Sequence, residues 1–195
     1  MMLLQTMVIV SALTMTSYES HEGFLVRAQV GPTYAQTTLP LPIWGDMTFS
    51  GWGAGLNLSV GGSPIPNLSI GGIIGGNLAI NPELSIENGR SLSLDDITYS
   101  VFTLGAFINY YMPWNFFVTL SPMLTTINLE EDDDSLESDF GFGLRLEVGK
   151  EWWVSSNWGL GLSAYFLYSR NNLDDDIDIK MNTYSGGLML SVTYN

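Results

Sequence analysis

Two short stretches of aspartates are the residues whose type and spacing most suggest ligand chemistry. They are Asp132, Asp133, Asp134, Asp174, Asp176 and Asp178. The second stretch begins like a calcium-binding loop, D-x-D-x-D, but Ile179 stands where that loop needs glycine and Ser185 where it needs glutamate. This excludes an EF-hand. Weak divalent-cation binding by the two loops stays open, beside the simpler interpretation that these acids are solvated and repel one another.

Catalytic chemistry has few candidates. Hydrolysis usually needs a positioned base, most often histidine, and the chain has a single histidine, His21, far from the acidic stretches. Aspartates in water keep ordinary pKa values and make poor bases. The glycine repeat at 51–55, GWGAG, does not fit the G-x-G-x-x-G of a phosphate-binding loop. The sequence therefore predicts no enzyme, no cofactor and no metal site.

A different chemistry is suggested by charges placed inside an alternating stretch, FGFGLRLEVG at residues 140–149. Successive side chains of a strand point to opposite faces, so one face carries only large apolar residues. The other face carries glycines, one cation, Arg145, and one anion, Glu147. A soluble sheet would have many charges on its wet face, whereas small and paired residues are typical of the inside of a narrow membrane barrel.

Seven further stretches alternate in the same way, which gives eight predicted strands at 24–35, 48–60, 68–80, 98–111, 116–129, 140–149, 158–169 and 183–194. Long connections follow the odd-numbered strands and short ones the even-numbered strands. Pro122, inside the fifth strand, predicts a bulge because it has no backbone N–H. The fold class predicted is an all-β, eight-stranded antiparallel up-and-down transmembrane β-barrel.

Charge and aromatic residues are distributed as this barrel requires. All acidic residues other than Glu19, Glu22, Glu147 and Glu151 fall at the long-loop end. Aromatic residues form two predicted girdles, as at the two interfaces of a membrane. One girdle comprises Tyr110, Tyr111, Trp114, Phe116, Trp152, Trp153, Trp158 and Tyr194. The other comprises Tyr34, Trp52, Tyr99, Phe140, Tyr168 and Tyr184.

Composition limits the alternatives. Hydrophobic residues make up 46% of the 195 residues and charged residues 13%, with a formal net charge of -14. A nucleic-acid binder would need a basic stripe, and this sequence has none. With no cysteine there are no disulfides. Residues 1–20 hold a short apolar run ending in small residues, which predicts a signal peptide before a barrel domain at 21–195.

From about residue 23 to 195 the chain resembles the small outer-membrane β-barrels, the OmpA-, OmpX- and OmpW-like proteins of Gram-negative bacteria. The resemblance rests on architecture and on the closing stretch 184–194, YSGGLMLSVTY, whose aromatic Tyr194 is penultimate rather than terminal. It implies a monomer in outer-membrane lipids, with extracellular long loops and periplasmic termini. It also implies a non-enzymatic role in adhesion, envelope stability or passage of a small apolar solute, with an external ligand or surface bound through the acidic loops.

The rival interpretation is a soluble lipocalin-like carrier, apolar inside and polar outside. It would need Lys and Glu on its wet face, where this chain offers Gly, Ser, Thr and Asn. Under the membrane interpretation, several polar residues share the lumen near the periplasmic end: Arg27, Arg145, Glu147, Gln29, Asn57 and Asn109. Opposite charges in a partly dry interior offset each other's desolvation, so Arg27, Arg145 and Glu147 are predicted to form a polar plug that closes the periplasmic half of the lumen.

Overall fold

The structure is a computed structural model that describes residues 21–41, 45–80, 82–86, 90–93, 97–131, 134–174 and 177–195. The predicted signal peptide at 1–20 lies outside these residues. So do Asp132, Asp133 and Asp176, and the side chains of Asp134, Asp174 and Asp178.

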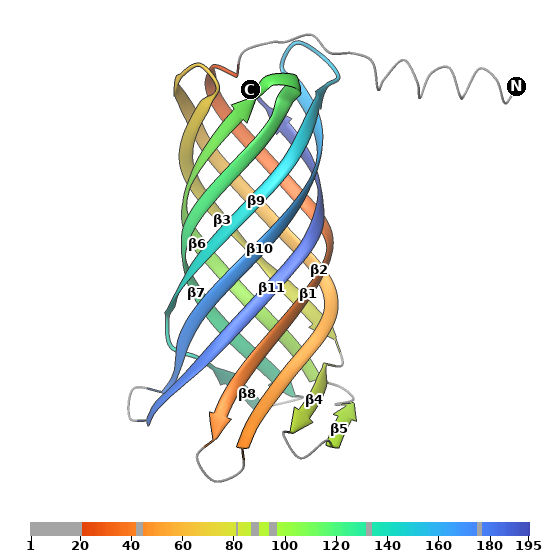
Figure 1. Cartoon of the computed structure of the whole chain (residues 1–195), viewed down its shortest axis with the longest axis vertical. Coiled ribbons are helices and arrows are strands. Elements are labelled where there is room, and N and C mark those ends of the chain that lie inside the picture. The colour runs from red at the N-terminus through yellow and green to blue at the C-terminus, as the bar shows by residue number, and fades with distance from the viewer. Residues whose placement is uncertain are drawn as a thin grey trace, which may run out of the picture.

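Eight long antiparallel strands close into a barrel, which confirms the predicted fold class (Figure 1). They are β1 (Gly23–Leu41), β2 (Gly45–Ile65), β3 (Leu68–Ile80), β6 (Ile97–Met112), β7 (Phe116–Glu131), β9 (Gly141–Trp153), β10 (Trp158–Asp174) and β11 (Ile177–Tyr194). Each strand pairs with its neighbour in the chain, and β1 also pairs with β11, so the sheet has no open edge along the barrel.

Three short strands extend the sheet at the end away from the termini. β4 (Glu83–Ile86) pairs with β2, β5 (Arg90–Ser93) pairs with β4, and β8 (Asp134–Glu137) pairs with β7. At the opposite end the connections are short. One of them is the 3-10 turn η1 (Pro113–Asn115), where Trp114 and Asn115 adopt positive φ. The C-terminus and the first described residues lie at this same end (Figure 1).

The predicted facing of the strands is confirmed. On β9, Arg145 and Glu147 are buried inside, whereas Leu144 and Leu146 are each nearly half exposed outside. The same alternation runs along β10, where Leu162 is exposed and Ser163 is buried. Period-two alternation alone is enough to place these side chains, because a strand has only two faces.

Most strands are longer than predicted, mainly toward the long-loop end, whereas β3 has the predicted bounds. The first was predicted to end at 35 and extends to Leu41; the last was predicted to begin at 183 and begins at Ile177. Backbone ladder bonds do not require apolar side chains. Polar residues therefore continue the pairing beyond the stretch in which apolar residues alternate.

Two details of the sequence prediction are wrong. The bulge at Pro122 is absent: β7 has the same register with β6 on either side, Gly105 opposite Met123 and Ile108 opposite Leu120. A proline removes one ladder donor without adding a residue. Three girdle aromatics, Tyr99, Tyr111 and Trp153, instead point inward and are buried.

The interior is filled by side chains along much of its length. Nine buried hydrophobic residues form one cluster: Leu25, Ile73, Phe107, Tyr111, Phe117, Met123, Tyr165, Leu167 and Met189. A second cluster toward the long loops contains Ala35, Ala79, Tyr99, Val101, Ile127 and Met181. An eight-stranded barrel is only wide enough for its side chains to fill, so these clusters act as a packed core.

Candidate functional site

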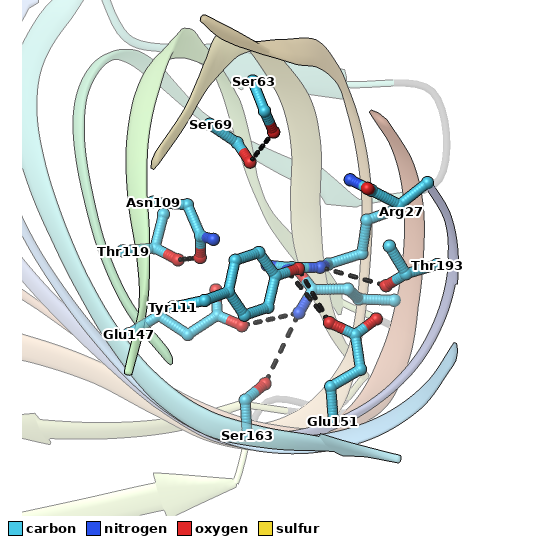
Figure 2. A network of polar contacts seen from close by, with 12 residues as sticks. Arg27, Ser63, Ser69, Asn109, Tyr111, Thr119, Glu147, Glu151, Ser163 and Thr193 are labelled. Carbon is cyan, nitrogen blue, oxygen red and sulfur yellow. Dashed lines mark hydrogen bonds and ion pairs between the residues drawn. The ribbon is translucent and has the colours of Figure 1, made fainter. Parts of the chain in front are cut away.

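The polar layer nearest the termini joins four strands around one ion pair. Arg27 on β1 lies 3.5 Å from Glu151 on β9, measured from Nη2 to Oε2. Tyr111 on β6 donates its hydroxyl to the same carboxylate oxygen at 2.7 Å and accepts a hydrogen bond from Arg27 Nη2. Arg27 Nε donates to Thr193 Oγ1 on β11 at 3.2 Å. Figure 2 shows these four side chains converging inside the barrel.

Space for Glu151 comes from a glycine on the next strand. A Cβ added at Gly159 would lie 2.7 Å from Glu151 Oε1, so a larger residue there would collide with the carboxylate. The guanidinium of Arg27 also lies 4.4 Å from the centroid of the Phe117 ring, within the range of a cation–π contact. The cation is thus held between an anion and an aromatic face.

The next polar layer holds a second ion pair. Arg145 donates from Nη2 to Glu147 Oε2 at 2.8 Å and from Nη1 to Asn57 Oδ1 at 2.8 Å. Gln29 donates to the other oxygen of Glu147 at 2.6 Å. The ring of Tyr165 lies 4.1 Å from the Arg145 guanidinium carbon. Arg145 and Glu147 are both less than 5% exposed, so this charge pair is withdrawn from water.

The contacts among the predicted lumen residues differ from the grouping that the sequence analysis predicts. Arg145, Glu147, Gln29 and Asn57 are joined directly. Arg27 pairs with Glu151, not with Glu147. Asn109 is buried nearby and accepts a hydrogen bond from Thr119 at 2.6 Å, apart from the two ion pairs.

Sequence reasoning missed Glu151 and Tyr111. A signal for Glu151 was present, because it lies four residues after Glu147 and therefore on the same inward face of the strand. Tyr111 was assigned to the girdle together with its neighbour Tyr110, although adjacent strand residues point to opposite faces. Tyr110 is exposed outside, and Tyr111 is buried.

His21 covers this terminal end of the network. Its ring stacks on Tyr111 at 3.3 Å between centroids and lies 4.9 Å from Trp153. Its backbone carbonyl accepts a hydrogen bond from the Asn67 amide in the β2–β3 turn at 3.0 Å. Burial lowers the pKa of His21 to about 4; Glu151 opposes this and Arg27 reinforces it. The imidazole is therefore neutral at pH 7.

A hydroxyl cluster occupies the long-loop half of the lumen. Thr37 on β1 lies 2.6 Å from the Tyr99 hydroxyl and 2.6 Å from Thr183 Oγ1. Nearby, Asn171 donates to the Thr125 carbonyl at 2.7 Å. These are neutral contacts that tie strands together across the interior.

The chemistry of the site is charge neutralisation. Within the described part of the chain, no three His, Asp or Glu side chains lie close enough to hold a metal ion. The aspartates proposed for weak cation binding lie outside the described side chains. Nor do the described residues include a helix long and apolar enough to cross a membrane, an observation that does not bear on strands.

No protein-family model and no curated protein matches the sequence. Solved structures do match. Neisserial surface protein A (NspA) shares 17% identity and a TM-score of 0.61 over 90% of this chain and 99% of that chain. Outer membrane protein OprG of Pseudomonas aeruginosa shares 8% identity and a TM-score of 0.52 over 90% and 98%. At such identities the likeness is one of fold: this chain is a small, closed, eight-stranded antiparallel barrel of the kind found in outer-membrane proteins.

Proposed function

We propose that this protein is an integral β-barrel of the Gram-negative outer membrane with a non-enzymatic surface or envelope role. The observation that supports this most is the apolar outer wall. Each long strand presents exposed aliphatic side chains to the outside, for example Val30, Leu56, Ile74, Leu104, Leu120, Leu146, Leu162 and Leu190. A continuous apolar belt of this extent is not stable in water, whereas a bilayer covers it.

The lipocalin-like alternative is wrong on the same ground. A soluble carrier needs an apolar cavity and a polar exterior. Here Arg27, Arg145, Glu147 and Glu151 are inside, and the aliphatic belt is outside. An apolar exterior around buried ion pairs does not fit a soluble carrier.

A surface or envelope role is favoured over wide-channel transport because the lumen is filled. Two ion-pair layers, the stacked His21 and the apolar cluster around Met123 and Met189 occupy the path through the barrel. NspA is by its name a surface protein, and the proposal extends that location to this chain. Adhesion or envelope stabilisation through the long loops needs no open pore.

The membrane assignment is tested by the behaviour of the purified protein. We expect it to require detergent, to resist carbonate extraction from vesicles, and to migrate faster on unboiled gels than after boiling. A monodisperse protein in plain buffer that migrates identically before and after boiling would overturn the proposal.

Orientation is a separate part of the proposal. The long loops, which carry most of the acidic residues, are placed outside the cell, and both termini in the periplasm. A cysteine at Ser135, in β8, should react with an impermeant maleimide on intact cells, and one at Ser155, in the β9–β10 turn, should react only after lysis. The opposite labelling pattern would invert the orientation.

Residues 1–20 are proposed to be removed as a signal peptide. Intact-mass measurement of the protein from outer membranes should show a chain that begins between about residues 13 and 21. An uncleaved mass would contradict this part of the proposal.

A further inference from the structure

The outer wall carries a groove near the end of the barrel where the termini and the turn η1 lie. It has a volume of about 810 Å³, within the usual range of ligand sites, and is lined almost wholly by apolar groups. The groove exists because Ala164 on β10 is small and lies between Leu188 of β11 and Val148 of β9 in the register of the sheet. Larger outward side chains on both sides form its walls.

A cation lies at one end of this groove. Lys150 is two residues beyond Val148 on the outward face of β9, opposite Phe116 of β7 and Leu162 of β10. Its ammonium lies 4.8 Å from the centroid of the Phe116 ring and 5.7 Å from that of Trp152. Cation–π contacts hold the ammonium in place without neutralising its charge.

The position of this lysine is informative because the protein has few cations. Only six of its 195 residues are Lys or Arg, and Arg27 and Arg145 of these are paired inside the lumen. A cation on the lipid face is costly at mid-membrane and is tolerated near the headgroups. Lys150 and the aromatic side chains of Trp114, Phe116 and Trp152 therefore mark the headgroup level.

We propose that this groove binds one glycerophospholipid, with the phosphate on Lys150 and an acyl chain over Ala164. The proposal rests on the membrane location proposed above. Charge complementarity supports the proposal, because a negatively charged phosphate would pair with the positively charged ammonium of Lys150. The acyl chain would fill the apolar groove that begins beside this ammonium. In the proposed orientation this lipid belongs to the periplasmic leaflet.

Native mass spectrometry of the full-length mature protein from detergent micelles tests the proposal. Palmitoyl-oleoyl phosphatidylglycerol and palmitoyl-oleoyl glycerol, which lacks the phosphate, are supplied in equal amounts. We expect one retained phosphatidylglycerol and little retained diacylglycerol. K150Q should weaken retention about fivefold, the effect expected for one lysine near a lipid phosphate, and K150R should restore it. A164L should abolish retention by filling the hollow.

Two matched variants control for general effects. A54L enlarges an outward alanine in another apolar groove, which no cation borders, and R170Q removes an outward cation elsewhere on the wall. Both should retain the lipid as the parent protein does. The proposal would be overturned if K150Q retained as much phosphatidylglycerol as the parent protein, or if A54L lost as much of it as A164L.

The remaining outcomes are also decisive. A dimer that A164L dissociates would assign the groove to a second copy of the chain, and retention of both lipids alike would show that the phosphate is not recognised. If A164L does not fold, K150Q and K150R carry the test alone. Loss of heat-modifiable migration in the parent protein would refute the membrane proposal itself, whereas a folded barrel without lipid preference would refute this inference only.

Discussion

At the scale of single residues, both buried arginines in the described part of the chain are paired with a carboxylate. Arg27 is paired with Glu151, and Arg145 with Glu147. The alternation of side chains along each strand was enough to predict that Arg27, Arg145 and Glu147 point inward. It was not enough to predict the partner of Arg27, because β1 and β9 are not neighbours in the sheet and meet only across the lumen.

The Arg145–Glu147 pair makes a prediction about stability. Glu147→Gln should cost about 3–5 kcal/mol of unfolding free energy, because it leaves the Arg145 charge buried without its partner. Glu147→Gln combined with Arg145→Met should cost less than the two single losses added together. Reversible urea unfolding in phospholipid vesicles measures all three variants and the parent protein.

A cross-pair variant provides the control. Arg27 belongs to the other ion pair but still interacts with Glu147 electrostatically, less strongly than Arg145 does. Glu147→Gln and Arg27→Met should therefore show a smaller coupling energy than Glu147→Gln and Arg145→Met. The sequence analysis groups Arg27, Arg145 and Glu147 in one plug, a grouping in which removing Arg27 would relieve the loss of Glu147 as much as removing Arg145 does. A coupling between Arg27 and Glu147 as large as that between Arg145 and Glu147 would restore that first grouping and contradict the contacts observed.

His21 gives a pH prediction with a definite sign. The unfolded chain has a histidine pKa of about 6.5, whereas burial lowers it to about 4 in the folded protein. Between these values the unfolded state binds more protons, so stability is full above about pH 6.5 and falls as the pH is lowered toward 4. The whole effect is about 3 kcal/mol at most.

Replacement by phenylalanine isolates this effect. His21→Phe keeps an aromatic ring to stack on Tyr111 and removes the titrating group. The difference in unfolding free energy between the parent and this variant should shift in favour of the variant as the pH falls from 7 to 4.5. A difference that does not change with pH would show that His21 is not buried against Tyr111.

At the scale of elements, the sequence specified which face of each strand points outward but not where each strand ends. Alternating residues such as Leu144, Arg145 and Leu146 left no ambiguity. Adjacent aromatic residues misled the prediction, because Tyr110 and Tyr111 were placed together in one girdle although only one of them can face outward. The strand lengths were underestimated where the outward residues become polar, because backbone hydrogen bonding between strands does not require an alternating apolar pattern in the sequence.

The facing of β10 gives a prediction that separates a membrane wall from a wet surface. Leu162 and Val154 are 46% and 57% exposed, so in water Arg should be tolerated about equally at both. In a bilayer, Leu162→Arg should lower the unfolding free energy by about 2–4 kcal/mol, and Val154→Arg, in the turn, by about 0–1. Urea unfolding in vesicles measures both, and equal losses would contradict the placement of Leu162 in the lipid.

At the scale of the whole molecule, the outer wall is apolar and the interior holds both polar and apolar layers. The eight barrel strands and their connections could be predicted from alternating stretches separated by long and short loops, but the short strands β4, β5 and β8 within those loops could not. The packing of the interior could not, because inward Met123, Leu167 and Met189 come from different strands and converge only when the barrel closes. The sequence analysis expected polar side chains to close the lumen, whereas the structure closes it with polar and apolar layers together.

Conductance across a planar lipid bilayer tests most directly the central claim, that this is a membrane barrel with a filled lumen. The protein is first reconstituted in vesicles of the same lipid, where heat-modifiable migration and protection from protease verify its insertion. The inserted protein should then show no large, steady, porin-like current. A steady open channel from the inserted native protein would contradict the account, because ions cannot pass through a lumen that Arg27, Glu151, Arg145 and Glu147 fill.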